Sequence, residues 1–424
     1  MKRLMIVFLC VVWGMKATAQ LTLDACTDRV MKHYPLIKQY DLTKQVEAYS
    51  LSNIEKVYWP QISMSAKATL QSEAIDISLP LPPTPIEIKQ SKDQYQITLD
   101  INQTVWDGGL TASKKKIVRG NSAIEKKQLD VELYKLRDQV NQLFFSLLFY
   151  NEQSKQLDLL EQELAQNRQV LKSNLKQGTI GQHDLNLFDV EKLEVQQQRI
   201  ELKSSQEKIR NALSVLMGEE MTSSTMLMKP LIAKSSPAQF DQRPEMQLIA
   251  QQIQLIELQK EVEKEGFNPK IGLFVQGGYG RPGLNLMNNT FQPYYIGGVR
   301  MNWNISHLYT KKNNLNTLQS NQLKLESLKE TWVLNNNIQL KKLHIEEKAL
   351  LEKMKTDEEM IRLKTEIKQA CASKVANGMA TTTDLLKEIH AESMARLQKE
   401  LHELQLLLNQ ENIKYVTNQT HSTR

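Results

Sequence analysis

Three glycines in this sequence have a spacing that suggests a binding function. Gly278, Gly280 and Gly283 match the spacing of a loop that binds the pyrophosphate of a dinucleotide. Such a loop must join a strand to a helix, because the helix N-terminus attracts the phosphate charge. Here Pro282 and the polar stretch Asn285–Asn289 follow, and another strand-like segment comes next. We therefore expect these glycines to belong to a hairpin between two strands, and we expect no cofactor.

The ionisable residues show no catalytic or metal-binding pattern. The seven histidines are scattered, with no pair at the spacing of metal ligands on one helix. No Ser/His/Asp set or pair of carboxylates stands out, so we expect neither catalytic residues nor an enzyme. His183 precedes Asp184 and could make its surroundings pH-sensitive, although a solvated side chain is the simpler interpretation.

Asp184 and Asp384 form a matched pair of carboxylates, each following a glycine, Gly178 or Gly378, at the same spacing. An acidic residue near the start of a helix is stabilised by the helix dipole. In a threefold assembly, Asp384 would also form a ring of carboxylates that favours cations at a narrow mouth. Lys387 lies about one helical turn further along and could offset that ring. Both interpretations can hold together.

These matched residues belong to a duplication that covers the whole chain. A repeat of roughly 200 residues is too long to be one solenoid element, so each copy is a complete assembly. We predict a first repeat over residues 20–239, ending in a linker, a second over 240–415, and a polar tail over 416–424. The landmark pairs are Pro35 with Pro244, Pro60 with Pro269, Trp106 with Trp303, Gly178 with Gly378, and Asp184 with Asp384.

Each repeat contains a long helix and a shorter returning helix. Ala112–Gln177 contains no proline, and Tyr309–Asn377 contains neither glycine nor proline. At ~1.5 Å per residue, each helix would be roughly 100 Å long. Glycines end both segments, which predicts antiparallel hairpins with tips near residues 178–184 and 378–384. In the first, apolar residues recur at the four-and-three spacing of a coiled coil: Leu129, Leu133, Leu136, Val140, Leu143 and Leu147.

A two-residue alternation precedes each long helix. It predicts strand hairpins over about 60–106 and 269–304, with strands long enough to cross a bilayer when tilted. Four strands cannot close, and an open sheet edge is not tolerated in lipid, whereas three chains supply twelve strands. The predicted fold is mainly α, a trimeric tube that is part helical and part β-barrel. The apolar positions are Ile62, Met64, Ala66, Ala68, Leu70, Tyr95, Ile97, Leu99, Ile101, Ile271, Leu273, Val275, Tyr279, Tyr295, Val299, Met301 and Trp303.

The first nineteen residues are typical of a secretory signal peptide. Lys2 and Arg3 precede the apolar run Leu4–Trp13, and Ala17-Thr18-Ala19 favours cleavage before Gln20. The run is about half the ~20 residues that a spanning helix needs. Without the three basic residues of this segment, the formal net charge falls from +6 to +3, so no nucleic-acid partner is expected.

Two cysteines remain beyond the signal peptide, Cys26 and Cys371, and they lie in opposite repeats. A disulfide between them is one possibility, and two packed thiols on helices are the other.

Short motifs recur in a fixed order along both repeats: Leu21–Ala25, His33–Pro35, Tyr58–Ile62, Val105–Gly109, Gly178–Leu185, Arg243–Glu245, Asn268–Ile271 and Gly378–Leu385. In these motifs and their order, the chain resembles the TolC-like outer-membrane efflux proteins. That resemblance implies a trimer with a twelve-stranded barrel in outer-membrane lipid, a helical tunnel through the periplasm, and a closable tip. It also implies that a periplasmic adaptor docks at the tips, at Gly178, Thr179, Gly378 and Met379.

The resemblance is incomplete at the second tip. The family often has an arginine two residues after the tip glycine and an acidic residue three after the aspartate, where this chain has Ala380 and Lys387. Any tip lock or acidic ring must therefore differ. The predicted periplasmic gate residues are Asp184, Asp384 and Lys387.

The predicted function is a passive outer-membrane channel of a tripartite efflux or type I secretion system, served by an inner-membrane pump. A periplasmic or surface coiled-coil scaffold without channel activity is the alternative.

Overall fold

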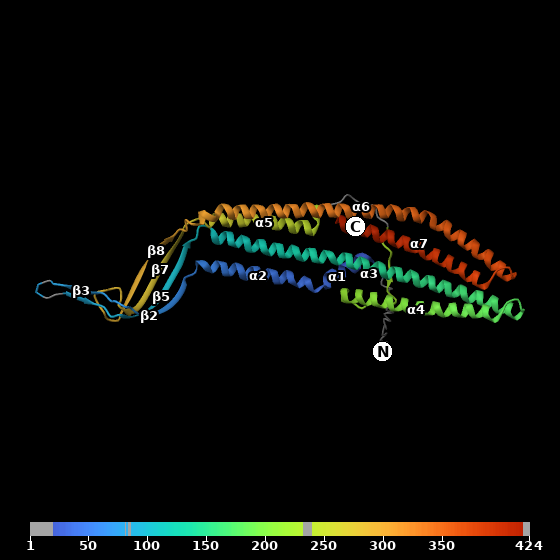
Figure 1. Ribbon diagram of the computed structural model, residues 1–424, viewed down its shortest axis with the longest axis horizontal. Helices are drawn as coiled ribbons and strands as arrows, with labels where there is room; N and C mark the ends of the chain where they lie inside the picture. The colour runs from blue at the N-terminus through green and yellow to red at the C-terminus, as the bar shows by residue number, and fades with distance from the viewer. Residues whose placement is uncertain (1–19, 81, 84–85, 232–239, 419–424) are drawn as a thin grey trace, which may run out of the picture. The chain divides into compact units, whose positions relative to one another are not determined.

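The computed structural model describes residues 20–80, 82–83, 86–231 and 240–418 (Figure 1). The predicted signal peptide lies outside the described residues, as does most of the predicted polar tail. Among the described residues, none of the helices is long and apolar enough to cross a membrane.

The chain divides into two compact units, and each draws on both halves of the sequence. Unit 1 consists of Met1–Ile37, Leu129–Met246 and Thr331–Arg424. Unit 2 consists of Lys38–Gln128 and Gln247–Glu330. The predicted duplication thus interleaves in space, because each unit is built from corresponding segments of the two copies.

Unit 2 contains one antiparallel sheet of four strands, in the order β2-β5-β7-β8. These strands are β2 (Gln61–Leu70), β5 (Asp93–Trp106), β7 (Lys270–Arg281) and β8 (Gln292–Asn302). Strands from the two halves of the sequence meet where β5 pairs with β7. The four predicted strands are confirmed, and β2 and β8 form the two edges of the sheet.

Two short ribbons were not predicted. β3 (Asp76–Leu79) pairs with β4 (Ile86–Lys89) in the connection between β2 and β5. β1 (Gln20–Leu21) pairs in parallel with β6 (Met226–Leu227) in unit 1. Strands of two to four residues are too short to show a periodicity in the sequence.

The glycines that resemble a dinucleotide fingerprint lie in a strand hairpin, as predicted. Gly278 and Gly280 are inside β7 rather than in its loop, and Gly283 is in the connection to β8. A Cβ atom on Gly278 would lie 2.3 Å from the ring of Tyr294, so a side chain there would collide with the ring. Close cross-strand packing therefore accounts for this glycine.

The helices form the two predicted antiparallel hairpins, α3 with α4 and α6 with α7 (Figure 1). The long members, α3 and α6, contain 67 and 70 residues. The helical elements are α1 (Leu23–His33), η1 (Pro35–Ile37), α2 (Lys38–Glu55), η2 (Lys56–Tyr58), α3 (Leu110–Lys176), α4 (Gln182–Met217), η3 (Phe240–Gln242), α5 (Pro244–Glu265), α6 (His307–Ala376) and α7 (Thr382–Thr417).

The predicted apolar seam of α3 is buried, except that Leu143 is half-buried. The buried surface is wider than a coiled-coil seam, because Tyr134, Phe144 and Phe145 are buried as well. Tyr134 stacks on Tyr415 of α7, with ring centres 4.9 Å apart. Within unit 1, α3 therefore packs against more than its own hairpin partner.

Both cysteines are free thiols on helices, with Cys26 buried in α1 and Cys371 half-buried in α6. The Cys26 thiol lies 3.6 Å from the sulfur of Met217. The packed-thiol interpretation is confirmed.

Candidate functional site

The two hairpin tips have nearly the same backbone geometry. Gly178 and Gly378 end α3 and α6 with φ of +71° and +70°, in the left-handed region that favours glycine. At the first tip, Thr179 N–H donates to Asn174 O at 3.1 Å and Gly178 N–H donates to Leu175 O at 3.1 Å. These bonds satisfy carbonyl groups that the helix end leaves free. Both tip glycines are exposed, as are Thr179 and Met379.

An apolar cluster beneath the tips joins the two hairpins. Phe188 of α4 and Ile389 of α7 are almost fully buried in it, together with Val195. Ile180 and Ala380, from the two tip loops, pack against the same cluster. The sequence thus holds both tips on one core while their outermost residues stay in solvent.

Asp184 and Asp384 close the first turns of α4 and α7 in matching ways. Asp184 Oδ2 accepts a hydrogen bond from Gly181 N–H at 3.0 Å. Asp384 Oδ2 accepts from Thr381 N–H at 3.0 Å and from the Thr381 hydroxyl at 2.6 Å. The hydroxyl oxygen in turn accepts from Asp384 N–H at 3.1 Å. The helix-start interpretation of both residues is confirmed.

The charge state of Asp384 follows from this cap. Hydrogen bonds from Thr381 lower the pKa of the Asp384 carboxyl, and the nearby Lys387 ammonium contributes to the same shift. The Asp384 carboxylate is exposed, and so is Lys387. His183 is also exposed, with Nε2 3.4 Å from Asp184 Oδ2. Within the described parts of the chain, no group of three or more His, Cys, Asp or Glu residues could hold a metal ion.

A buried carboxylate, which the sequence analysis did not single out, connects the hairpins near the tips. Glu392 of α7 accepts from Arg396 Nε at 2.9 Å and from the Thr365 hydroxyl at 2.8 Å, and it pairs with Lys368. Lys368 of α6 also bonds to Glu163 of α3. Glu163, Lys368, Glu392 and Arg396 line a groove of about 590 Å³, whose other lining residues lie mainly on α3. Lys368 thus joins the first helical hairpin to the second.

The pKa of Glu392 gives this link an expected pH dependence. Burial alone would raise the pKa, but hydrogen bonds from Lys368, Arg396 and Thr365 lower it from 4.5 to about 2. A carboxyl with a lowered pKa stabilises the folded state above its unfolded pKa, and this contribution is lost as the pH falls.

We expect the link between the hairpins to weaken as the pH falls from about 4.5 to about 2. Protease cleavage at the tips should increase over that range. Glu392→Gln should remove this dependence and, at neutral pH, cost about 2 kcal/mol, because each pKa unit corresponds to ~1.4 kcal/mol before solvent screening. Glu359→Gln is the control, because Glu359 pairs with Arg362 on the exposed side of α6. Equal acid sensitivity in wild type and Glu392→Gln would contradict the assignment.

A second unpredicted cluster surrounds Arg243, just before α5. Its guanidinium carbon lies 4.4 Å from the ring centre of Tyr134, 4.8 Å from that of Tyr415 and 5.4 Å from that of Trp332. Arg243 Nη2 pairs with Glu245 Oε1 at 2.7 Å, and Arg243 Nη1 donates to Tyr415 O. The Arg243-Pro244-Glu245 motif was visible in the sequence, but its aromatic partners lie on distant helices.

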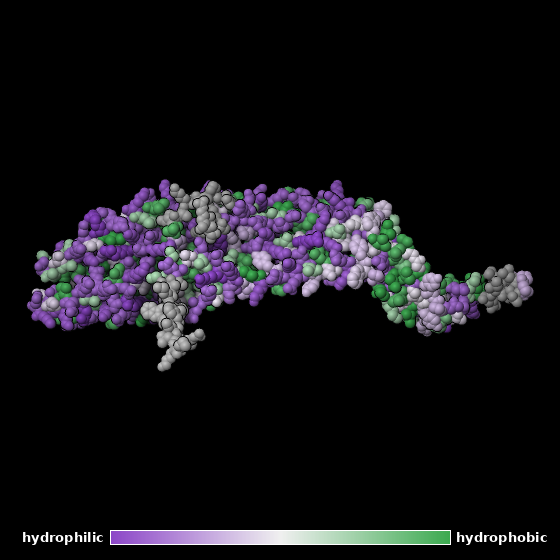
Figure 2. All heavy atoms as spheres, turned by 180° about the vertical axis from the view of Figure 1, so that it is seen from behind, coloured by the Kyte–Doolittle hydropathy of each residue, from purple (hydrophilic) through white to green (hydrophobic). Residues whose placement is uncertain are grey.

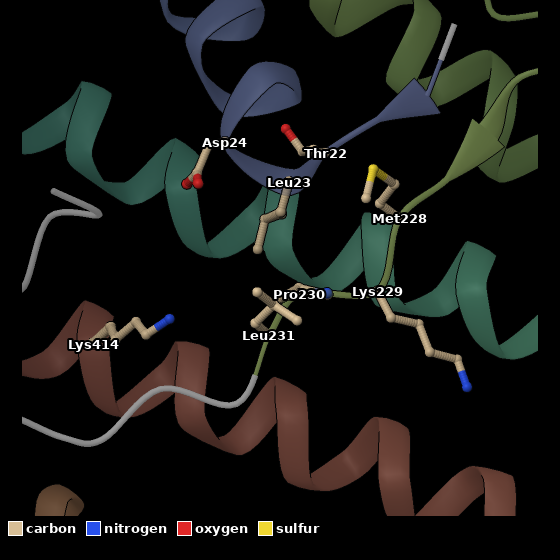
Figure 3. A pocket seen from close by; sticks show the side chains of 8 residues that line it. All are labelled: Thr22, Leu23, Asp24, Met228, Lys229, Pro230, Leu231 and Lys414. Atoms are coloured by element: carbon tan, nitrogen blue, oxygen red, sulfur yellow. The ribbon is translucent and has the colours of Figure 1, made fainter. Parts of the chain in front are cut away.

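A small pocket of about 330 Å³ lies beside the β1–β6 ribbon (Figure 3). Leu23, Met228, Pro230 and Leu231 supply much of its lining. The Lys229 side chain points away from Leu23 in Figure 3 and is bound by Glu400 and Glu403 at 2.9 and 3.0 Å. Thr22, Asp24, Lys229 and Lys414 complete the lining of the pocket. We assign this pocket no chemistry.

The sheet of unit 2 has one continuous apolar face. The register places Met64 opposite Leu99, Ile101 opposite Val275, and Leu273 opposite Val299. These side chains remain exposed; Met64 is 74% exposed and Val299 is 69% exposed. Figure 2 shows apolar residues gathered over the strands, whereas the helices are covered mainly by polar residues. An exposed apolar surface of this extent needs a non-aqueous partner.

Aromatic residues flank this apolar face at both ends of the strands. Trp59 precedes β2, Trp106 ends β5 and Trp303 follows β8. The strand register places all three at one end of the sheet, and all are exposed. Phe291 and Tyr279 lie at the opposite end, with ring centres 5.8 Å apart. Aromatic girdles of this kind mark the two interfaces of a bilayer.

Comparison with known proteins identifies the fold. The sequence matches no protein-family model and no curated protein. In structure, the chain is similar to the outer-membrane channel OprN, with 13% sequence identity, a TM-score of 0.69, and coverage of 94% of this chain and 90% of that one. The outer membrane protein VceC of Vibrio cholerae is similar at 12% identity and a TM-score of 0.65, covering 93% of this chain and 95% of VceC.

The MtrE outer membrane channel of Neisseria gonorrhoeae is similar at 14% identity and a TM-score of 0.64, covering 93% of this chain and 88% of MtrE. Because these likenesses extend over nearly the whole chain, they establish its fold. The chain has the fold of TolC-like outer-membrane channels, and the predicted fold resemblance is confirmed.

Proposed function

We propose that three copies of this chain form a passive channel through the outer membrane. In this assembly the sheets of unit 2 lie in lipid and the helical hairpins reach into the periplasm. A periplasmic adaptor binds at the tips, and an inner-membrane pump supplies the energy for efflux or type I secretion.

The exposed apolar face of the sheet is the observation that carries this proposal. Burying apolar surface yields roughly 25 cal/mol per Å², and lipid is the partner that a face with aromatic borders fits best. The opposite face is polar and includes Ser63, Asp100 and Gln276. A sheet with one lipid face and one aqueous face suits the wall of a water-filled conduit.

The open edges of the sheet support assembly of several chains. β2 and β8 are edge strands of 10 and 11 residues, and each leaves one row of backbone groups unpaired within the sheet. Such groups must be satisfied in lipid, and pairing β8 of one copy with β2 of the next would do so. Three copies give twelve strands, enough to enclose a lumen.

The tips are the proposed site of adaptor binding and of the gate. Gly178, Thr179, Gly378 and Met379 are exposed. Among the described residues, no atom beyond each glycine's chain neighbours lies within 4 Å of where its Cβ would be, so a partner helix could approach the backbone closely. Asp184 and Asp384 occupy the first turns of α4 and α7, and Lys387 lies about one turn after Asp384. We propose that Asp384 lines the periplasmic mouth and that Lys387 partly offsets its charge.

The gate proposal predicts changes in ion selectivity. Asp384→Asn keeps an acceptor for Thr381, so it tests the charge with less damage to the helix cap than Asp384→Ala. In a planar bilayer, both variants should lower cation preference and weaken block by multivalent cations. Lys387→Asp should strengthen cation preference. Both effects should shrink at high salt, where the Debye length falls to ~3 Å at 1 M. Unchanged reversal potentials in intact trimers would leave Asp384 only its structural role.

The alternative function, a coiled-coil scaffold, predicts different behaviour in solution. A scaffold outside the membrane does not require an exposed apolar sheet face. Such a protein should remain soluble without detergent. The channel proposal predicts extraction with the outer membrane and sedimentation in detergent as a particle of three chains. A monomer or dimer that stays soluble without detergent would contradict the channel proposal.

A further inference from the structure

The polar face of the sheet carries an unequal set of charges. The two-residue alternation and the strand register place Lys67, Asp100, Lys270 and Arg300 on this one face. Lys67, Lys270 and Arg300 are exposed. Three cations therefore share the face with a single carboxylate.

The carboxylate does not neutralise these cations. Asp100 accepts hydrogen bonds from Gln276 Nε2 at 2.6 Å and from the Thr98 hydroxyl at 3.1 Å. In the parts of the chain that the structure describes, no carboxylate oxygen lies within 4.0 Å of the charged nitrogens of Lys67, Lys270 or Arg300. By contrast, Arg281 on the apolar face is paired with Asp93. The polar face thus has an uncompensated positive charge.

Arg300 is held in a defined position on this face. Its guanidinium carbon lies 4.6 Å from the centre of the Phe274 ring. The ring in turn lies over Gly298, where an added Cβ would be 3.2 Å from a ring atom. This stack fixes one face of the guanidinium and leaves its N–H groups free to donate to a solute.

A shallow pocket of about 170 Å³ lies beside this stack. Its lining includes Lys270, Arg300, Asn102, Asn302 and Gln61. Two cations and three amides are suited to bind carboxylate, sulfonate or phosphate oxygens, and Phe274 adds an aromatic surface in the same lining.

We propose that this face makes the sheet portion of the conduit prefer anions, and that the Arg300–Phe274 stack with Lys270 is a contact site for aromatic anions. The inference rests on the proposed function, in which the polar face lines the lumen. Three copies would bring nine such cations and three carboxylates around one passage, where low-dielectric walls strengthen their field.

The proposed anion preference is tested by the reversal potential of the intact trimer in a planar bilayer under a KCl gradient. The combined variant Lys67→Gln, Lys270→Gln and Arg300→Gln should shift the potential in the cation-selective direction, and the single variant Arg300→Gln should shift it less. Lys89→Gln is the matched control, because Lys89 lies on β4 outside this sheet, and it should cause no shift. The shift should diminish at high salt.

Block by naphthalene disulfonate tests the contact site. Phe274→Leu and Arg300→Lys should both weaken the block while leaving the reversal potential near that of the wild type, because neither changes the charge. Conducting channels whose reversal potential is the same in wild type and the combined variant would overturn this inference and leave the channel function intact. A wild-type trimer that does not conduct would instead contradict the proposed function, and this inference would fall with it.

Discussion

Arg243→Ala should destabilise unit 1 by about 3–5 kcal/mol, because it removes one partner of a buried ion pair. Arg243 is 4% exposed and contacts three aromatic rings as well as Glu245. Its loss would leave the Glu245 carboxylate without that partner and open a cavity between Tyr134 and Trp332. We expect a clear fall in the melting temperature, measured by circular dichroism on the purified protein in detergent.

Two variants separate the causes of this effect. Arg243→Lys should be more stable than Arg243→Ala but less stable than the wild type. An ammonium group cannot form the bidentate ion pair with Glu245 or stack on the aromatic rings. Arg29→Ala should cost less than ~1 kcal/mol, because Arg29 pairs with Glu219 on the surface. Similar melting temperatures for Arg243→Ala and Arg29→Ala would show that the buried cluster contributes little.

Met64→Lys should prevent stable insertion of the sheet into the membrane. Met64 lies on the apolar face of β2, and a lysine facing lipid at mid-membrane costs ~2–4 kcal/mol per chain. Three copies would multiply that cost in the proposed trimer. We expect a sharp fall in the amount of trimer recovered from the outer-membrane fraction.

Ser63→Lys is the matched control for Met64→Lys. Ser63 is the neighbouring residue on the polar face and lies opposite Asp100, so its lysine variant should insert normally. If both variants insert equally well, the apolar face does not contact lipid. If Ser63→Lys alone fails, the two faces have been assigned the wrong way round.

The sequence predicted the elements whose periodicity extends over many residues. The alternation from Ile62 to Leu70 reflects which side chains share one face of a strand. The seam from Leu129 to Leu147 reflects which side chains share one face of a helix over several turns. Both patterns are local consequences of strand and helix geometry. The helix ends at Gly178 and Gly378 were equally predictable, because the left-handed conformation at a helix C-terminus strongly favours glycine.

The sequence could not predict the clusters around Arg243 and Glu392. Tyr134 and Tyr415 reach Arg243 from opposite halves of the chain, and Lys368 joins Glu163 to Glu392 across two hairpins. Contacts between such distant residues leave no periodic trace in a single sequence. A weak signal was present at Arg243, because Arg243-Pro244-Glu245 is one of the motifs that carry the family resemblance.

The charge on the polar face of the sheet was also missed. The alternation placed Lys67 and Arg300 among the polar positions, but only the pairing of β5 with β7 brings the strands of the two halves into one surface. The sequence therefore indicated which residues share the polar face of the sheet but not which charges on it remain unpaired.

Single-channel recording with the detergent-purified protein tests the proposed channel most directly. The protein should sediment as three chains and, after addition to a planar bilayer, produce conductance steps of uniform size that the Met64→Lys variant does not produce. A three-chain particle that inserts into the bilayer without any conductance, or a protein that remains soluble as a monomer without detergent, would contradict the proposed channel.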